Sequence, residues 1–247
     1  MINIKNRNEI KCMIEAGRIV KETLLLMEKN INPGISTIEL DRIAEDYIRS
    51  QNATPGFKGL YDYPSTICIS IEDEVVHGLP SDKKLKQGQI VSIDVGSIYK
   101  GYYGDHAKSF PVGVIDDDKQ NLLDVTKKCL ELGISKAQPG NRIGDIGSAI
   151  QKYAEDNGYG VVRELVGHGI GSQLHEEPQI PNFGKMGTGP VIDVGMCFAI
   201  EPMINMGSKE VYTKNDGWTI CTKDGLPSAH FEHTITITDE GPQILTA

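Results

Sequence analysis

The alternation of helical and strand-like sequence along this 247-residue chain constrains its fold more than any other feature. In the first stretch, apolar residues recur at intervals of three, four and seven, which predicts one apolar face of a helix. These residues are Met13, Val20, Leu24 and Met27. A proline and a glycine at residues 33 and 34 then turn the chain, and the spacing of Ser36 and Glu39 predicts a capping box at the start of a second helix.

The complete order is helices, strands, helices and strands. We expect helices at residues 8–29, 37–50, 119–135 and 143–157. We expect strands at residues 66–71, 90–95, 99–103, 196–200, 210–213, 218–222 and 230–238. This order predicts an α+β fold in which two similar halves face each other, with a site between them.

The composition is that of a globular protein that has no dominant basic surface. Apolar residues make up 39% of the chain, charged residues make up 24%, and the formal net charge is −9. We therefore expect neither a nucleic-acid partner nor an anionic membrane partner. The compact basic cluster of Lys83, Lys84 and Lys86 lies between predicted strands, and we interpret it as a solvated loop.

The cysteines and the apolar runs indicate where the protein is found. The five cysteines are scattered and form no C-x-x-C pair, which favours a reducing compartment over a disulfide framework. No apolar run approaches the roughly 18 residues that a membrane span needs. Lys5 and Arg7 precede polar residues, so no secretory signal is predicted, and we expect a cytoplasmic protein.

Acidic residues stand inside strand-like apolar sequence or at its end. Asp94, Glu201 and Glu232 have this setting, where a carboxylate is costly to bury without a partner. Any one of them could instead be an edge-strand residue that faces water. Together with Asp105, and with His168 among glycines, they form an oxygen-rich set with one imidazole, which suits divalent ions such as Mn, Fe, Co or Zn.

These five residues, in this order, resemble the metal-ligand set of the methionine aminopeptidases. Residues 75–80 (VVHGLP) and 175–178 (HEEP) are similar to the two active-site histidine segments of that family. The resemblance covers nearly the whole chain and is to the short bacterial form, type I. It implies a pita-bread fold, in which two pseudo-symmetric α+β halves surround a dinuclear metal site, and residues 1–247 as a single catalytic aminopeptidase domain.

The resemblance also implies a reaction. Asp94 would hold one divalent ion, His168 and Glu201 the other, and Asp105 and Glu232 would bridge the two. A metal-bridged hydroxide would attack the scissile carbonyl and release the initiator methionine from nascent proteins and peptides whose second residue is small. The identity of the ions, among Co, Mn, Fe, Zn and Ni, does not follow from the sequence.

Three residues carry catalytic roles by the same resemblance. Glu201 would take the proton of the attacking water and pass it to the leaving amine, and His175 would stabilise the oxyanion. His77 would lie near the scissile amide, although a packed histidine after a strand is its other interpretation. The remaining histidines, His106, His230 and His233, are assigned no chemistry.

A methionine pocket needs apolar, polarisable walls. The resemblance places the substrate-binding residues there: Tyr63, Cys68, His77, Leu174, His175 and Trp218, with Phe57 as a weaker candidate. Core packing is the alternative for Trp218, and a buried inert thiol is the alternative for Cys68. Glu72 stands where many relatives have asparagine, which puts in doubt a monovalent-cation site to which Ser228 would contribute.

Two other functions remain open at this stage. A proline-directed relative, such as a prolidase or aminopeptidase P, shares the five ligands but usually carries an extra N-terminal domain. A catalytically inactive binding module of the same fold would be expected to have lost ligands. The expected partners are peptides that begin with methionine and nascent chains at the ribosome, and the expected state is a monomer.

Overall fold

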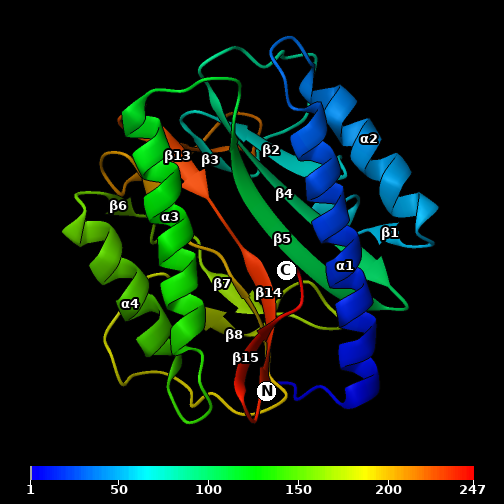
Figure 1. Cartoon of the computed structure of the whole chain (residues 1–247), viewed down its shortest axis with the longest axis vertical. Coiled ribbons are helices and arrows are strands. Elements are labelled where there is room, and N and C mark those ends of the chain that lie inside the picture. The colour runs from blue at the N-terminus through cyan, green and yellow to red at the C-terminus, as the bar shows by residue number, and fades with distance from the viewer. Residues whose placement is uncertain (1) are drawn as a thin grey trace.

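The structure, a computed structural model, describes residues 2–247 as two groups of helices and strands (Figure 1). The helices are α1 (Arg7–Asn30), α2 (Thr37–Ser50), α3 (Asp117–Lys136), α4 (Ile143–Asp156) and the short 3₁₀ helix η1 (Leu60–Asp62). The four expected helices agree with the observed ones to within two residues at each end. The prediction of an α+β fold is confirmed.

The first half is built on the long hairpin of β4 (Ile90–Tyr99) and β5 (Tyr102–Pro111). Strands β1 (Thr54–Pro55) and β2 (Ile67–Ile71) pair with β4, and α1 and α2 pack on this sheet. Fully buried aliphatic side chains from these elements form one core. The helices and the sheet therefore hold each other by an apolar interface, as the periodicity predicts.

The second half joins α3 and α4 to two small sheets. One sheet has the order β13 (Ser228–His230), β10 (Met203–Asn205), β6 (Gly160–Val161). The other has the order β15 (Gly241–Ile244), β14 (His233–Thr238), β9 (Cys197–Ile200), β7 (Gly167–Gly169), β8 (Glu176–Ile180). A separate three-stranded sheet contains β11 (Val211–Thr213), β12 (Ile220–Thr222) and β3 (Glu74–Val76).

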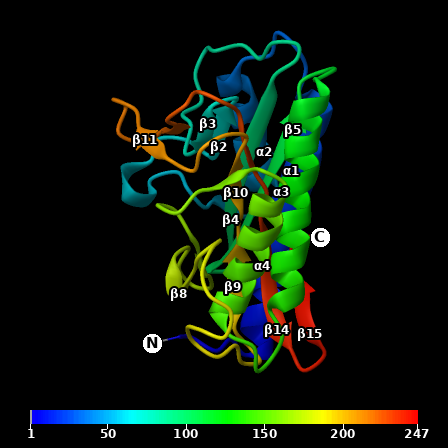
Figure 2. The same ribbon diagram turned by 90° about the vertical axis from the view of Figure 1, so that its left-hand side faces the viewer.

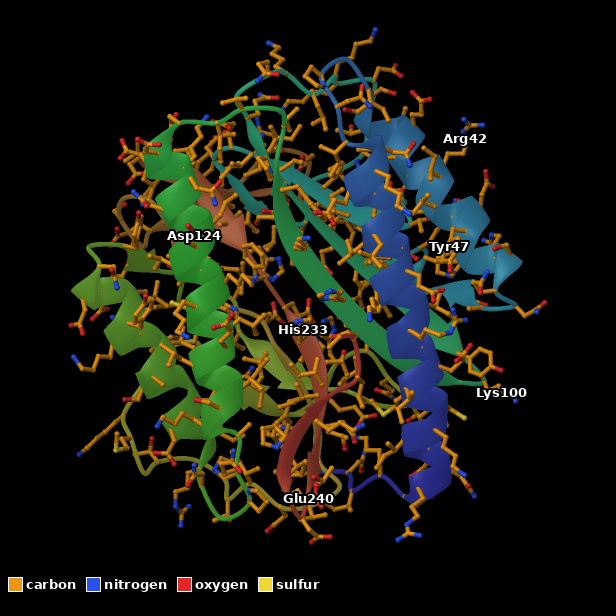
Figure 3. All side chains as sticks on the ribbon, viewed as in Figure 1. Arg42, Tyr47, Lys100, Asp124, His233 and Glu240 are labelled. Atoms are coloured by element: carbon orange, nitrogen blue, oxygen red, sulfur yellow. The ribbon has the colours of Figure 1, made fainter. Side chains whose placement is uncertain are left out.

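The helices of both halves cover the same side of the strands. In Figure 1, α1 and α2 lie to the right and α3 and α4 to the left, with the strands behind them. In Figure 2, α1 and α3 run along one side, while β3, β8 and β11 lie on the opposite side. Each helix pair thus covers its own half, and the strands of both halves come together behind the helices.

Three local predictions are wrong in detail. Residues 99–103 are not one strand, because the chain reverses at Lys100 and Gly101 between β4 and β5. Residues 230–238 are interrupted at residues 231–232, which lie between β13 and β14. Ser36 precedes α2 but makes no side-chain cap hydrogen bond, whereas Asn6 forms a capping box with Glu9 at the start of α1.

A helix that crosses a bilayer must be both long and apolar. Within residues 2–247, no helix is both long enough and apolar enough to cross a bilayer.

Candidate metal centre and substrate pocket

A cavity of about 130 Å³ receives side chains from both halves. Its walls comprise Phe57, Leu60, Tyr61, Tyr63, Cys68, His77, Asp94, Asp105, His168, Leu174, His175, Glu201, Trp218 and Glu232. All of the predicted site residues are among them. One end of this set is carboxylate and imidazole, and the other is aromatic and apolar.

The first half contributes two carboxylates through the register of its hairpin. Gly96 lies opposite Asp105 in the β4–β5 ladder, so Asp94, two residues before Gly96, points to the same face. The backbone of Asp105 is fixed further by Thr234 of β14: its N–H donates to Thr234 Oγ1 at 3.0 Å, and its carbonyl accepts from the same hydroxyl at 2.8 Å. Both acids are therefore placed by regular strand geometry.

The second half contributes an imidazole whose free nitrogen is already oriented. His168 lies in β7, and its Nδ1 donates to the carbonyl of Gly169 at 2.9 Å. The Nε2 lone pair is then left facing Glu201 Oε1 at 3.5 Å and Asp105 Oδ2 at 3.8 Å. A ring that donates through one nitrogen and presents the other is the usual arrangement of a metal-binding histidine.

The two glutamates of the second half stand where strands stop. Glu201 follows β9 directly, and its carbonyl accepts from the side-chain amide of Asn182 at 3.0 Å. Glu232 lies in the interruption between β13 and β14, and its N–H donates to the carbonyl of Ala107 in β5 at 2.9 Å. This bond ties the second half to the first beside the cluster.

Burial opposes ionisation of all four acids. It raises the pKa of Asp94 to about 7 and that of Glu201 to about 8. It also raises the pKa values of Asp105 and Glu232 well above their ordinary range, and the neighbouring carboxylates add to this increase. Burial, with His175 nearby, lowers the pKa of His168 to about 4. Without a cation, four buried acids and a neutral imidazole share one site.

The donor set fits divalent ions. Asp94 Oδ1, Asp105 Oδ1 and Glu232 Oε1 are buried and have no hydrogen-bond partner. One ligand atom each from Asp105, His168 and Glu232 lies within 4.8 Å of the others. Hard oxygen donors and one imidazole nitrogen, left unpaired and mutually repelling, are what a divalent cation would satisfy.

The apolar end of the cavity is rigid. Tyr63 and Trp218 meet edge to face, with ring centroids 5.0 Å apart and planes at 77°. The hydroxyl of Tyr63 lies 3.1 Å from the carbonyl oxygens of both Ile67 and Gly78, so the ring is anchored to the backbone around β2 and β3. Cys68 lies opposite Asp94 in the β2–β4 ladder, and burial raises the pKa of its thiol well above normal. The thiol therefore acts as an apolar wall.

Two histidines stand between the acidic end and the apolar end. His77 follows β3 with a left-handed backbone (φ 59°), and burial lowers the pKa of its ring to about 4. His175 precedes β8, makes an edge contact with the ring of His168 (centroids 4.5 Å apart), and is stacked by Tyr61 (5.9 Å, 9°). Near neutral pH, His77 is therefore a neutral ring that can donate one hydrogen bond.

Comparison with known proteins identifies the family of this chain. Residues 11–239 match the description "Metallopeptidase family M24". The chain belongs to metallopeptidase family M24. Membership of a metallopeptidase family implies a divalent metal, and the set of acids with one histidine offers suitable ligands for it.

Within family M24, several relatives that match this chain over its full length are methionine aminopeptidases. A methionine aminopeptidase of Clostridium perfringens is 51% identical over 246 residues, which is 100% of this chain and 99% of the relative. Methionine aminopeptidase 1 of Bacillus subtilis is also 51% identical, with the same coverage. The crystal structure of methionine aminopeptidase from Thermotoga maritima matches with a TM-score of 0.98 at 45% identity, covering 100% of this chain and 99% of that one. The resemblance found in the sequence is confirmed.

The proline-directed members of family M24 share the fold at greater distance. Prolidase from Pyrococcus furiosus matches with a TM-score of 0.82 at 24% identity, and the match covers 99% of this chain and 65% of that one. The pita-bread fold, with two α+β halves around the site, is therefore confirmed.

The sequence analysis missed three residues at or beside this M24 site. Leu60 and Tyr61 line the cavity from η1, and their only signal was a glycine- and tyrosine-rich loop. His230 was assigned no chemistry, yet its Nε2 lies 3.7 Å from Glu201 Oε2. His106 and His233 do not line the cavity; they stack on each other, with centroids 4.5 Å apart.

Glu72 is the departure from the family pattern that the sequence analysis noted. Its carboxylate forms an ion pair with Lys119 Nζ at 2.8 Å, and its carbonyl accepts from the N–H of Ser228 at 2.9 Å. The ammonium group of Lys119 therefore pairs with the Glu72 carboxylate at the position where a monovalent cation was in doubt.

Proposed function

We propose that this chain is a methionine aminopeptidase that removes the N-terminal methionine of peptides and nascent proteins when the second residue is small. This proposal is supported by one small cavity that combines the acid–histidine cluster with a wall of aromatic rings and a thiol. The cluster supplies the site for metal-assisted hydrolysis, and the wall suits a thioether side chain.

The ligands would divide as follows in the proposed dinuclear site. Asp94 would hold one ion, and His168 and Glu201 would hold the other, while Asp105 and Glu232 would bridge them. Two bound divalent ions would supply an acidified water and polarise the scissile carbonyl. Oxygen and imidazole donors accept Co, Mn, Fe, Zn and Ni, so the metal supply in the cell would decide which ions are bound.

The chain's own residues would bind and orient the substrate. Tyr63, Cys68, Leu174 and Trp218 would contact the methionine side chain and exclude water from it. Because the Tyr63 ring is anchored by its hydroxyl, this wall is fixed before the substrate arrives. A bulkier second side chain would crowd the ions held by the acidic residues.

Proton transfer would be carried by Glu201 and the two histidines. Glu201 would accept the proton of the attacking water and deliver it to the leaving amine. His175 would donate to the oxygen on which negative charge develops. His77, neutral near pH 7, would donate to the scissile amide region without adding positive charge beside the ions.

The remaining expectations complete the proposal. We propose that residues 1–247 act as one catalytic domain, as a monomer in the cytoplasm, on chains that emerge from the ribosome.

The test is hydrolysis of Met-Ala-Ser, Met-Leu-Ser and Ala-Pro-Ala by chelator-treated protein supplied with Co or Mn. We expect release of methionine from Met-Ala-Ser only, and its loss in Asp105→Ala. Cleavage of Ala-Pro-Ala instead would assign the chain to the proline-directed branch. A folded, ion-binding protein that cleaves none of the three would favour the binding-module alternative.

A further inference from the structure

His230 is a buried polar side chain that the proposed reaction does not use. Only 1% of its surface is exposed, and neither ring nitrogen has a hydrogen-bond partner among residues 2–247. Its backbone, in contrast, is fully held: the N–H donates to Ser109 Oγ and the carbonyl accepts from the same hydroxyl, both at 2.9 Å. An unpaired buried polar group destabilises the folded state, so a partner for this ring is expected in the working enzyme.

The ring is directed at the proposed proton acceptor. His230 Nε2 lies 3.7 Å from Glu201 Oε2, and Glu201 Oε1 lies 3.5 Å from His168 Nε2. The two oxygens of one carboxylate thus face two different imidazoles. His168 presents a lone pair, because its Nδ1 carries the hydrogen that Gly169 accepts. His230 has no such constraint, so its Nε2 is free to carry a hydrogen.

His230 is also set apart from the ion-binding cluster. The ligand atoms that lie within 4.8 Å of one another come from Asp105, His168 and Glu232. Asp94 and Glu201 also lie outside this group but are proposed ion ligands, whereas His230 has no such role in the proposed function. Bound ions would satisfy the unpaired oxygens of the acids but would leave the ring of His230 unpaired. Glu201 Oε2, at 3.7 Å from His230 Nε2, is a carboxylate oxygen that could accept a hydrogen bond from the ring.

We propose that His230 is a positioning residue, whose Nε2–H donates a hydrogen bond to Glu201 Oε2 and fixes the orientation of that carboxylate. Contraction from 3.7 Å to hydrogen-bond distance accompanies loading of the site, since catalytic hydrogen bonds are often long before it. Glu201 then keeps Oε1 toward His168 and Oε2 in place to receive a proton. This inference rests on the proposed function, because it assigns a partner to the proton acceptor of that reaction.

The test uses two amides that mimic different nitrogens of the ring. In His230→Gln the amide nitrogen reaches the position of Nε2, whereas in His230→Asn it reaches only that of Nδ1, and His230→Leu offers no donor. With Met-Ala-Ser and saturating Co, we expect His230→Gln to keep kcat within about threefold, and the other two variants to lose about 10- to 100-fold. KM should stay unchanged, because the interaction acts on the chemical step. At saturating Co the number of bound ions should also stay unchanged, because Glu201 Oε1 remains beside His168 as an ion ligand.

Each other outcome overturns the inference. Wild-type kcat in His230→Leu would show that the ring positions nothing. Equal loss in the Gln and Asn variants would exclude a donor at Nε2, and loss of an ion in His230→Gln would make His230 a ligand instead. If His230→Leu does not fold, the Gln and Asn pair still decides. A wild-type protein that binds Co but releases no methionine overturns the proposed function itself, which separates the two failures.

Discussion

The two sides of the candidate site are built by different means. Asp94 and Asp105 project from a long, regular hairpin, and their placement follows from strand register. His77 and His175 lie outside the strands, and Glu232 lies in the interruption between two strands. The regular side needs no additional support, because each residue of a ladder is fixed by its neighbours. The irregular side needs other contacts to hold its side chains.

Buried polar contacts supply that support. Lys5 Nζ pairs with Glu176 Oε2 at 2.7 Å, and each of the two side chains is only 5% exposed. The same ammonium donates to the carbonyl of Asn3, and the backbone N–H of Lys5 donates to Gly195. Glu176 directly follows His175, so the segment before α1 fastens the histidine loop of the opposite half. Precise placement of a loop residue here depends on a charge pair that is costly to bury.

The largest loss of activity is expected when a proposed ion ligand on the β4–β5 hairpin is replaced. In Asp105→Asn we expect kcat to fall about 1,000-fold, or about 4 kcal/mol of transition-state stabilisation, because a ligand to the ions is lost. We also expect the metal-free variant to melt above the metal-free wild type, since one of four mutually repelling acids is gone. Hydrolysis of Met-Ala-Ser, calorimetric titration of Co and thermal unfolding measure the three quantities.

The control for this variant is Asp82→Asn, which changes an exposed acid. It should leave all three measurements at wild-type values. Full Co binding and activity in Asp105→Asn would show that the hairpin does not supply a required ligand.

This comparison also explains what the sequence could predict. The helices have periodic signals and were placed to within two residues, whereas the strand predicted at residues 99–103 ended before Asp105. The interruption before β14 has no such signal, because residues 230–238 read as one β-branched run. His230 was missed for a related reason: its importance depends on the direction of Glu201, which only the three-dimensional structure provides. Ligand roles came from resemblance, whereas spacing alone left each acid ambiguous.

The second prediction concerns the Lys5–Glu176 ion pair, which holds the loop that carries His175. Lys5→Met should lower the free energy of unfolding by about 2 kcal/mol, because Glu176 loses its ammonium partner and keeps only the hydrogen bonds from Asn3 and Gln173. It should also lower kcat about tenfold, since the loop that carries His175 loosens. Urea unfolding and steady-state kinetics of Met-Ala-Ser measure the two effects.

Two further variants control for charge and packing. Lys5→Arg keeps the ion pair and should recover most of kcat. Lys5→Met combined with Glu176→Met removes both charges and should recover stability but not kcat. A stability loss in Lys5→Met with unchanged kcat would mean that the ion pair does not position His175.

The third prediction concerns the pH dependence of stability, which the acid cluster should dominate in the metal-free protein. In the metal-free folded protein the pKa values of Asp94 and Glu201 are raised to about 7 and 8, above an unfolded value of about 4. The folded state therefore binds protons more tightly, and its stability falls by several kcal/mol as pH rises from about 4 to 8, at about 1.4 kcal/mol for each unit of pKa shift. Urea unfolding in chelator at about pH 5 and pH 8 measures this difference. With saturating Co the fall should disappear, and a fall that persists would locate the titrating groups outside the cluster.

The smallest change is expected at Asn6, which directly follows Lys5 in the segment before α1. Asn6 Oδ1 accepts from the N–H groups of Asn8 and Glu9, so Asn6→Ala should cost about 1 kcal/mol of stability. Ser36 makes no such bond, so Ser36→Ala should cost less than about 0.5 kcal/mol. Both variants should keep wild-type kcat on Met-Ala-Ser, because a helix cap acts on the regular half alone, whereas Lys5 acts on the histidine loop. If Asn6→Ala lowers kcat as Lys5→Met does, the whole segment before α1 supports the site. The helix cap at Asn6 would then affect the histidine loop as well as the regular half.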